Sequence, residues 1–416
     1  MDPQLPEPLT LSWPADDPGV LVETVAGLGG VETWLPIETR PVQVGTTQIL
    51  HLPLAGLLGE GNTRFWRMTL LEEGVHLFPV TLTVRNLDDN FAGSLRQAIQ
   101  DAHSGDAIVF AKGLAGMIRL TSGELVINKN LRIIGPGAKL LTVSGAFGNR
   151  VMRIDSPADV SVSGLTVAEG LSDDAPGIYA RGSLTLVDCI VRNNEGLALN
   201  YGPGGGGILA YGRCVLRNCT ITHNSAHVGG GVAALGDLTV ENCTIAENRA
   251  YEFGGGIYSN GGYISVSSST VYGNQGVLAG GGLFSDICAA CVPLPKISNS
   301  LIAGNTDAAG APDCGGKFLS LGSNLLGRAD GSTGWGAPGD QVGSAANPLD
   351  PKLGPLQDNG GPTPTMAPLP GSKAIDQGRR NGLNTDQRGK PRPKDLSSVV
   401  NASFGDGSDI GAVEVQ

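Results

Sequence analysis

A unit of eleven residues occurs six times in this chain and constrains its fold more than any other feature. The copies start at residues 160, 184, 214, 238, 264 and 295, so successive starts lie 24 to 31 residues apart. Five copies end in Asn, and the first ends in Gly. A constant unit with variable spacing is typical of a solenoid, in which one side of each coil is fixed and loops on another side vary.

Apolar and polar residues alternate within the unit with the period of two that a half-buried strand requires. Positions 1 and 3 are apolar, position 5 turns the chain, and position 8 is Val or Ile. Glycine runs at 204–207, 229–231, 254–256 and 280–282 mark the remaining side of the coils, because glycine allows positive φ and close approach of backbones. The sequence therefore predicts an all-β fold in which residues 131–310 form a right-handed parallel β-helix of triangular coils.

Stacking such coils places equivalent residues about 4.8 Å apart. Asparagines at the bends are expected to hydrogen-bond along the stack, which satisfies amides that burial would otherwise leave without partners. Position 6 is expected to face inward, where buried thiols act as small apolar filler and are chemically inert. The residues at this position are Leu165, Cys189, Cys219, Cys243, Ser269 and Ser300.

The segments on either side of the repeats lack the eleven-residue unit and are predicted to form other structures. Residues 1–80 are rich in Pro and in short strand-like runs, and they predict a small β-sandwich module. Residues 81–130 include a short amphipathic helix at 94–103, which predicts an N-terminal cap for the first coil. Residues 311–416 lose the repeat and are rich in Pro and Gly, which predicts a C-terminal cap with an extended wrap.

Composition limits the partners and the compartment. The net charge of −11 and the pI near 4.9 argue against nucleic acid, because no basic stripe is available for phosphates. No apolar run is long enough to span a bilayer. No basic region precedes an apolar segment at the start of the chain, so any secretory signal is expected to have been removed. A cytosolic protein without a signal is the alternative.

The chain has seven cysteines, so at least one thiol is unpaired within a monomer. Cys288 and Cys291 are spaced as in metal and redox sites, but no second such pair and no paired histidines lie nearby. A loop disulfide between one of them and Cys314 is the favoured interpretation, and it fits an oxidising compartment.

Several longer motifs resemble known families. LTVRNLDDNFAGSLRQAIQDA and DAIVFAKGLAGMIRLTSGELVINKNLRIIGPG, both between residues 81 and 154, resemble the N-terminal caps of large secreted bacterial right-handed β-helix proteins. SLGSNLLG at 320–327, DPKLGPLQDNGGPTPTMAPLPGSKAIDQG at 350–378, TDQRGKPRP at 385–393 and DIGAVE at 409–414 look like the choice-of-anchor Q domain.

The GGGI and TIxxN repeats are similar to those of polymorphic outer-membrane proteins and related adhesins, and residues 1–75 look like a β-sandwich module of secreted Verrucomicrobia-type proteins. The resemblance implies export and a location outside the cell or at its surface. It implies no established catalytic residues.

The position before the closing Asn gives a column of polar residues on neighbouring coils, namely Glu169, Asn193, His223 and Glu247. His223 and Glu247 are expected to lie close enough to act as acid/base and partner. Arg192, one position earlier, would steady a substrate carboxylate. The alternative is a solvated ladder of mixed polar residues.

Aromatic residues beside this column are candidates for saccharide binding, since loops often carry function. They are Tyr201, Tyr251, Phe253 and Tyr272, and Asn193 of the column is a further candidate for substrate binding. Packing over the sheet edge is the alternative for Tyr251 and Phe253. Asp173 and Asp174 could act as paired carboxylates or bind calcium, but turn formation explains them equally. Asp406 and Asp409 form a second candidate calcium site, and no other cofactor is expected.

Two classes of function remain open. The favoured one is an extracellular or cell-surface protein that binds polysaccharide or a cell-surface glycan, or acts as an adhesin or structural surface protein. The alternative is a polysaccharide lyase or glycoside hydrolase that acts on an outward groove of the β-helix.

Overall fold

The computed structural model describes residues 79–197, 204–286 and 293–416, together with the backbone of six strands between residues 9 and 70. Two compact units divide the chain. One contains Met1–Val80 with His103–Asp106, and the other contains Thr81–Ala102 with Ala107–Gln416. The described cysteines, the repeats and every site discussed below belong to the second unit.

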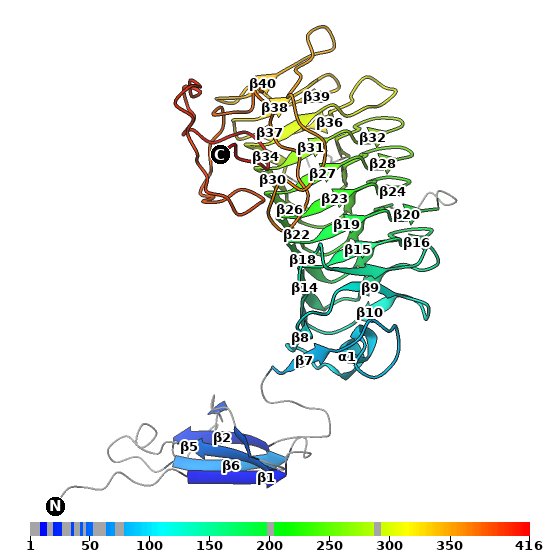
Figure 1. Cartoon of the computed structure of the whole chain (residues 1–416), viewed down its shortest axis with the longest axis vertical. Helices are drawn as coiled ribbons and strands as arrows, with labels where there is room; N and C mark the ends of the chain where they lie inside the picture. Colours follow the sequence, from blue (N-terminus) through cyan, green and yellow to red (C-terminus); the bar gives the residue numbers. More distant parts are fainter. Residues whose placement is uncertain are drawn as a thin grey trace, which may run out of the picture. The chain divides into compact units, whose positions relative to one another are not determined.

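The second unit is a parallel β-solenoid of about nine coils, in which each strand pairs in register with its counterpart on the next coil (Figure 1). Three long sheets run along it. Sheet 1 consists of β7 (Thr81–Val84), β8 (Ala107–Phe110), β11 (Leu131–Ile134), β14 (Asp159–Ser163), β18 (Ser183–Val187), β22 (Cys214–Arg217), β26 (Leu238–Glu241), β30 (Ile264–Ser267), β34 (Lys296–Ser298) and β37 (Leu319–Ser320).

Sheet 2 consists of β9 (Gly116–Arg119), β12 (Leu141–Ser144), β15 (Thr166–Ala168), β19 (Ile190–Arg192), β23 (Thr220–Thr222), β27 (Thr244–Ala246), β31 (Thr270–Tyr272), β35 (Leu301–Ala303), β38 (Leu325–Leu326) and β40 (Gln341–Val342). Sheet 3 consists of β10 (Leu125–Ile127), β13 (Met152–Ile154), β17 (Ile178–Ala180), β21 (Ile208–Ala210), β25 (Val232–Ala234), β29 (Ile257–Ser259), β33 (Leu283–Ser285), β36 (Cys314–Lys317) and β39 (Ser332–Thr333). The predicted parallel solenoid is thus confirmed.

A fourth, short sheet follows the closing residue of the first five repeats, where variable loops alone were expected. Sheet 4 consists of β16 (Leu171–Ser172), β20 (Glu195–Gly196), β24 (Ser225–Ala226), β28 (Arg249–Ala250) and β32 (Gln275–Gly276). In these five coils, the two residues after the closing residue therefore keep the stack in register before the loops diverge, and the coils are not simple triangles.

Both corners of sheet 2 are made by residues with left-handed backbone. Position 5 of the unit turns the chain between sheets 1 and 2, with φ of 47° to 61° from Gly164 to Asn299. Position 10 turns it from sheet 2 into sheet 4, with φ of 54° for His223 and 59° for Glu247. Asn, Asp and Gly tolerate this conformation best, which explains their frequency at position 5.

One continuous apolar core fills the solenoid from Val84 to Leu326. The position 6 residues are fully buried, as predicted. Burial raises the pKa of the Cys189 and Cys219 thiols well above the ordinary value, because a thiolate would lose its hydration. These thiols are therefore filler and poor nucleophiles.

The closing asparagines form a single hydrogen-bonded ladder. The Nδ2 and the backbone N–H of each Asn donate to the Oδ1 of the Asn on the next coil, at 2.8 to 3.1 Å. The ladder begins at Gly170, whose N–H donates to Asn194, and ends at Asp313, whose Oδ1 accepts from Asn305. Every described closing Asn is therefore satisfied inside the solenoid.

The glycine runs pass so close to the next coil that a side chain would collide with it. A Cβ on Gly206 would stand 2.4 Å from the carbonyl oxygen of Gly230, and one on Gly230 would stand 2.4 Å from that of Arg249. Glycine is required here by close approach of backbones, as the sequence predicted.

A short helix, α1 (Leu95–Asp101), lies in the segment before the first complete coil. Ser94 caps its N-terminus by accepting a hydrogen bond from the backbone N–H of Gln97. Its buried residues Leu95, Ala98 and Ile99 belong to the same core as the coils.

The first unit contains two antiparallel sheets of three strands. β1 (Leu9–Pro14), β5 (Thr47–Leu52) and β4 (Val42–Val44) form one, and β3 (Leu35–Pro36), β2 (Val20–Ala26) and β6 (Arg64–Leu70) form the other. The predicted sandwich packing of this unit stays a prediction.

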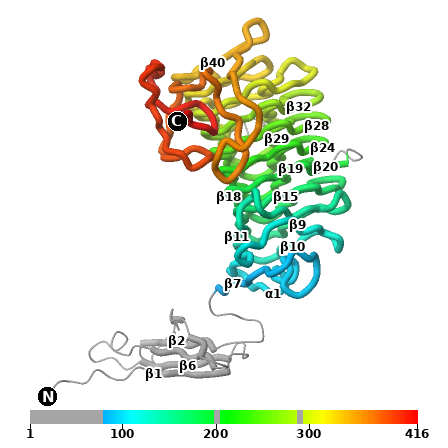
Figure 2. The backbone as a smooth tube through the Cα atoms, viewed as in Figure 1, coloured from blue at the N-terminus to red at the C-terminus, as the bar shows by residue number. Residues whose placement is uncertain are grey.

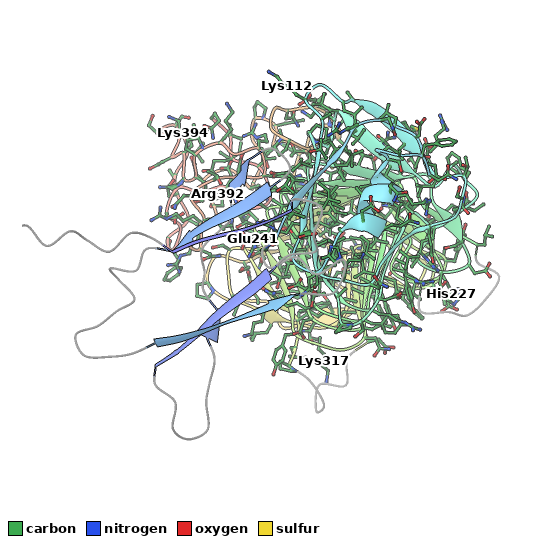
Figure 3. All side chains as sticks on the ribbon, turned by 90° about the horizontal axis from the view of Figure 1, so that it is seen from below. Lys112, His227, Glu241, Lys317, Arg392 and Lys394 are labelled. Carbon is green, nitrogen blue, oxygen red and sulfur yellow. The ribbon has the colours of Figure 1, made fainter. Side chains whose placement is uncertain are left out.

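Residues 350–416, here called the C-terminal segment, cover the outer face of sheet 2 in the later coils (Figure 2). Thr220 donates to the carbonyl of Pro364, Thr244 donates to the side chain of Gln387, and both threonines are fully buried. Seen along the stack, Arg392 of this segment and His227 lie on opposite sides of the solenoid (Figure 3).

Among the described residues, no helix is both long enough and apolar enough to cross a membrane.

Candidate functional site

Of the outward polar column predicted from the sequence, only His223 and Glu247 have side chains in contact with each other. His223 Nε2 lies 3.2 Å from Glu247 Oε2, as the stacking predicted, and both side chains are about half exposed at a convex corner. His223 Nδ1 also lies 2.8 Å from the hydroxyl of Thr222. The pair has the geometry of an acid/base and its partner.

Of the other proposed catalytic residues, Glu169 lies far from this pair, whereas Arg192 lies on the coil before His223. Glu169 stands three coils from Glu247, which is about 14 Å at the strand spacing. Its carboxylate accepts a hydrogen bond of 2.6 Å from the hydroxyl of Ser144, on the side away from His223. Arg192 pairs in register with Thr222, and Asn193 donates its backbone N–H to the Thr222 carbonyl.

Three of the proposed saccharide-binding aromatics are engaged within the protein. Tyr272 packs against a cluster that includes Ala374 and Ile410 of the C-terminal segment. Phe253 stacks on Phe284 with ring centroids 4.7 Å apart, which is the edge packing considered as its alternative. The guanidinium of Arg249 lies 5.2 Å from the centre of the Tyr251 ring. Tyr201 lies outside the described residues.

The cysteine and calcium predictions remain predictions. Cys314 is fully buried on β36, in register with Leu283 of the core, and it is a free cysteine in this structure. Cys288 and Cys291 lie outside the described residues. No group of three or more His, Cys, Asp or Glu side chains suited to a metal ion occurs in the described part of the chain.

The paired aspartates of the sequence have other partners in the structure. Asp174 forms an ion pair of 3.0 Å with Arg150. Asp409 accepts backbone hydrogen bonds from Asp376 and Val415, and burial raises its pKa to about 7. Asp406 binds the hydroxyl of Ser408.

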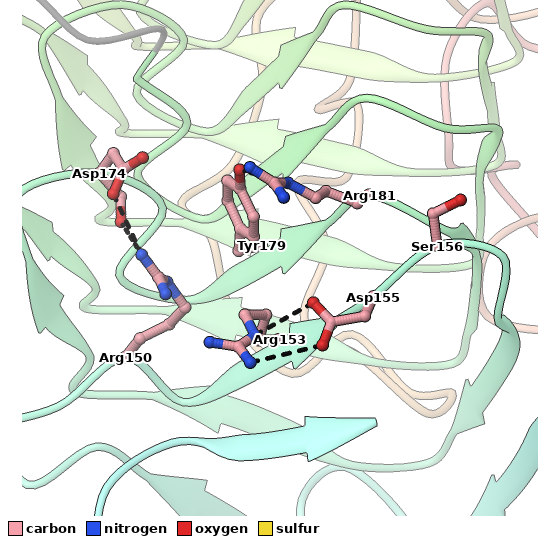
Figure 4. A pocket seen from close by; sticks show the side chains of 7 residues that line it. All are labelled: Arg150, Arg153, Asp155, Ser156, Asp174, Tyr179 and Arg181. Atoms are coloured by element: carbon pink, nitrogen blue, oxygen red, sulfur yellow. Dashed lines mark hydrogen bonds and ion pairs between the residues drawn. The ribbon is translucent and has the colours of Figure 1, made fainter. Parts of the chain in front are cut away.

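A hollow of about 620 Å³ opens on the outer face of sheet 3, on a different side of the coils from His223 (Figure 4). Its lining comes from β13, β17 and the turns beside them, so three successive stretches of chain contribute. The lining residues are Arg150, Arg153, Asp155, Ser156, Asp174, Tyr179 and Arg181. The hollow concentrates charge in a chain with only 16% charged residues.

Ion pairs fix two of the three arginines. Glu124, just before β10, bridges Arg150 at 2.7 Å and Arg153 at 2.8 Å. Arg150 also pairs with Asp174, and Arg153 pairs with Asp155 at 3.1 Å. Because these side chains are partly buried and linked through one carboxylate, the network is more rigid than isolated surface pairs would be.

Tyr179 lies at the centre of the hollow. Its hydroxyl accepts a hydrogen bond of 2.9 Å from Arg181 Nε, and the ring is in edge-to-face contact with Tyr211 at 5.8 Å between centroids. The guanidinium carbons of Arg150 and Arg181 lie 4.9 Å and 5.5 Å from the ring centre.

The outer face of sheet 3 continues from the hollow in both directions. Register places Val126 before Arg153 and Tyr179, and Leu209 after them. Beyond Leu209 the face becomes an apolar cluster that includes Tyr258 and Phe284. Val126 also lines a second hollow of about 380 Å³ beside α1. The two hollows lie on neighbouring coils along the same face.

Sequence reasoning missed this hollow. The repeat unit covers sheets 1 and 2, whereas the arginines lie on sheet 3 and in the turns beside it, a side of the coils marked in the sequence only by glycine runs. The signal that could have found them is the alternation in Met152–Ile154 and Ile178–Ala180, where an outward Arg153 or Tyr179 stands between two buried residues.

Residues 152–325 match the family described as right handed beta helix region. No curated protein matches this sequence. One similar solved structure is the catalytic unit of thermostable GH87 alpha-1,3-glucanase from Streptomyces thermodiastaticus strain HF3-3, with 13% identity, a TM-score of 0.28, and coverage of 80% of this chain and 84% of that one. A TM-score this low supports no argument about function. The family match and the stacked parallel sheets show that the chain contains a right-handed parallel β-helix.

Proposed function

We propose that this protein binds polysaccharide outside the cell or at the cell surface, through the outer face of sheet 3. The observation that supports this most is the hollow of about 620 Å³ around Tyr179, which is lined by charged and polar side chains. Saccharides present many oxygen atoms, and a cluster of fixed guanidinium groups offers hydrogen-bond donors to them.

The proposal includes the modules to which the sequence is similar. In it, residues 81–130 act as the N-terminal cap, residues 1–80 as a β-sandwich module, and the C-terminal segment belongs to a choice-of-anchor Q-like domain. An adhesin or structural surface role is the form of this function that needs no turnover.

A glycan array with the full chain tests the proposal. We expect binding to a subset of polysaccharides and a loss of at least about tenfold in affinity on Tyr179→Ala, because this change removes the support of Arg181. The matched control is Tyr263→Ala, since Tyr263 is 67% exposed and precedes β30 of sheet 1. Equal binding by both variants would place the binding face elsewhere, and absence of binding to every glycan contradicts the proposal.

A polysaccharide lyase or hydrolase is the second candidate. The distance of 3.2 Å between His223 and Glu247 favours it. Incubation with uronate-containing and neutral polysaccharides would then give unsaturated products or new reducing ends, and His223→Ala would abolish them. Product formation that is unchanged in this variant would rule out His223 as the acid/base.

A further inference from the structure

The carboxylates of the hollow have little capacity left for a ligand. Both oxygens of Glu124 are held by Arg150 and Arg153. Asp174 Oδ1 accepts from Arg150, and both oxygens of Asp155 lie against Arg153. The acceptors of the hollow are thus largely engaged within the protein, and the two arginines are committed to them.

Arg181 differs from the other two arginines. Its side chain is exposed, its Nε is held by the Tyr179 hydroxyl, and it forms no ion pair with a carboxylate within the described part of the chain. A guanidinium carries five N–H donors and no acceptor. The Nη groups of Arg181, which have no hydrogen-bond acceptor among the described residues, are therefore free charged donors that line the hollow (Figure 4).

The Tyr179 ring is not available as a platform for a sugar. Arg150 and Arg181 lie over it, and Tyr211 meets it edge-on. Recognition in this hollow consequently depends on guanidinium donors, which prefer anionic oxygens to neutral hydroxyls because charge-assisted hydrogen bonds are stronger.

We infer that the hollow binds the anionic group of an acidic saccharide, with the Nη groups of Arg181 donating to two of its oxygens. The group is a carboxylate or a sulfate ester, since either presents paired oxygens to the planar guanidinium fork. This inference rests on the proposed polysaccharide binding and specifies its ligand class. The net charge of −11 gives the chain no general attraction for anions, so the preference must arise locally.

Calorimetric titration of the full chain tests the inference with three oligosaccharides of equal length: a polyuronate, a sulfated glucan and a neutral glucan. We expect at least one acidic ligand to bind about tenfold or more tightly than the neutral one, with an affinity that falls as salt is added. The acidic ligand that binds more tightly shows whether the hollow prefers a carboxylate or a sulfate ester.

Variants of Arg181 test whether this residue causes the preference for acidic over neutral oligosaccharides. Arg181→Met should remove the preference for the acidic ligand, and Arg181→Lys should restore only part of it, because an ammonium lacks the planar fork. Arg132→Met is the matched control, since Arg132 is an exposed arginine on β11 of sheet 1, and it should leave the preference unchanged. Circular dichroism checks that all three variants remain folded.

Equal affinity for acidic and neutral ligands, or a preference that persists in Arg181→Met, overturns the inference and leaves the proposed polysaccharide binding intact. Absence of binding to all three oligosaccharides contradicts the inference, and a negative glycan array in addition contradicts the proposed function.

Discussion

At the scale of single residues, each buried asparagine of the ladder makes several hydrogen bonds that link neighbouring coils. Asn248 is 1% exposed and takes part in hydrogen bonds with two coils at once: it accepts from Asn224 and donates to Asn274. Its Nδ2 also donates to the carbonyls of Ile221 and Ala246. Removal of one such side chain leaves several buried polar groups without partners, and each costs more than a lost surface hydrogen bond.

We therefore expect Asn248→Ala to lower the free energy of unfolding by about 3 kcal/mol or more. Urea unfolding followed by circular dichroism measures the change. Asn90→Ala serves as the control, because the exposed Asn90 side chain makes a single hydrogen bond, to Ser122. A similar small loss in both variants would show that the ladder is redundant.

Buried carboxylates at the end of the chain should make stability depend on pH. Burial, together with the nearby Glu414 carboxylate, raises the pKa of Asp409 from 3.8 to about 7, although Asp409 also accepts a hydrogen bond from the backbone N–H of Asp376 and lies near the guanidinium of Arg392. The folded state then holds a proton that the unfolded state has released, so its contribution to stability falls as pH rises from about 4 to 7.

In Asp409→Asn, this part of the pH dependence should disappear. We expect the difference in stability between wild type and variant to change by roughly 1 kcal/mol per pH unit across that range, with wild type losing stability toward neutral pH. Unfolding midpoints at pH 5, 6 and 7 measure it. Parallel curves for the two proteins would show that Asp409 has an ordinary pKa.

At the scale of elements, the C-terminal segment covers the outer face of sheet 2 and does not cover the hollow on sheet 3. It covers Thr220, Thr244 and Thr270 of sheet 2, and the buried side chain of Gln387 lies at the centre of this contact. Gln387 donates to the Cys219 carbonyl and accepts from the Thr244 hydroxyl. The outer face of sheet 3, by contrast, carries the hollow.

Gln387→Ala should loosen this segment while the coils remain intact. We expect faster hydrogen exchange for amides of residues 385–415 and little change in the core strands, because the lost bonds link the segment to sheet 2. Gln377→Ala is the control, since the Gln377 side chain donates only to Val400 within the segment. Equal exchange in both variants would contradict a clamping role for Gln387.

The repeat unit allowed sheets 1 and 2 to be predicted, because their inward residues recur at fixed positions such as Val191, Ile221 and Ile245. The closeness of His223 and Glu247 followed from the same register. Two features could not be predicted in this way. The C-terminal segment has no repeat to fix its position, and the network of Arg150 and Arg153 depends on turns that occur once.

At the scale of the whole molecule, the solenoid is one core divided among similar coils, each of which contacts mainly its neighbours. The stability of such an array is approximately the sum of coil and interface terms. Residues 171–194 form one coil that begins at Leu171, which pairs with Glu195, and ends at Asn194, which stacks on Asn224. Removal of this coil would join Gly170 directly to Glu195, and the strands on either side of the deletion could then pair with each other in the same register.

Deletion of residues 171–194 should therefore yield a folded, shorter solenoid of lower stability. Asn224 would accept the hydrogen bond that Gly170 now gives to Asn194. The variant also lacks Tyr179 and Arg181, so we expect retained β-sheet by circular dichroism together with loss of acidic-saccharide binding. A random-coil spectrum would contradict the independence of the coils.

The direction of the asparagine ladder affects where duplication of a coil during evolution can lengthen the ladder. In the bonds between side chains, each Asn donates to the next one toward the C-terminal end and accepts from the one before, and the series stops at Asp313, whose carboxylate accepts but has no side-chain amide to donate. A tandem duplication in the gene that copies one coil upstream of Asp313 would insert a rung with all its partners already supplied. A copy placed downstream would not extend this series of asparagines, so duplication can lengthen the ladder only on the N-terminal side of Asp313.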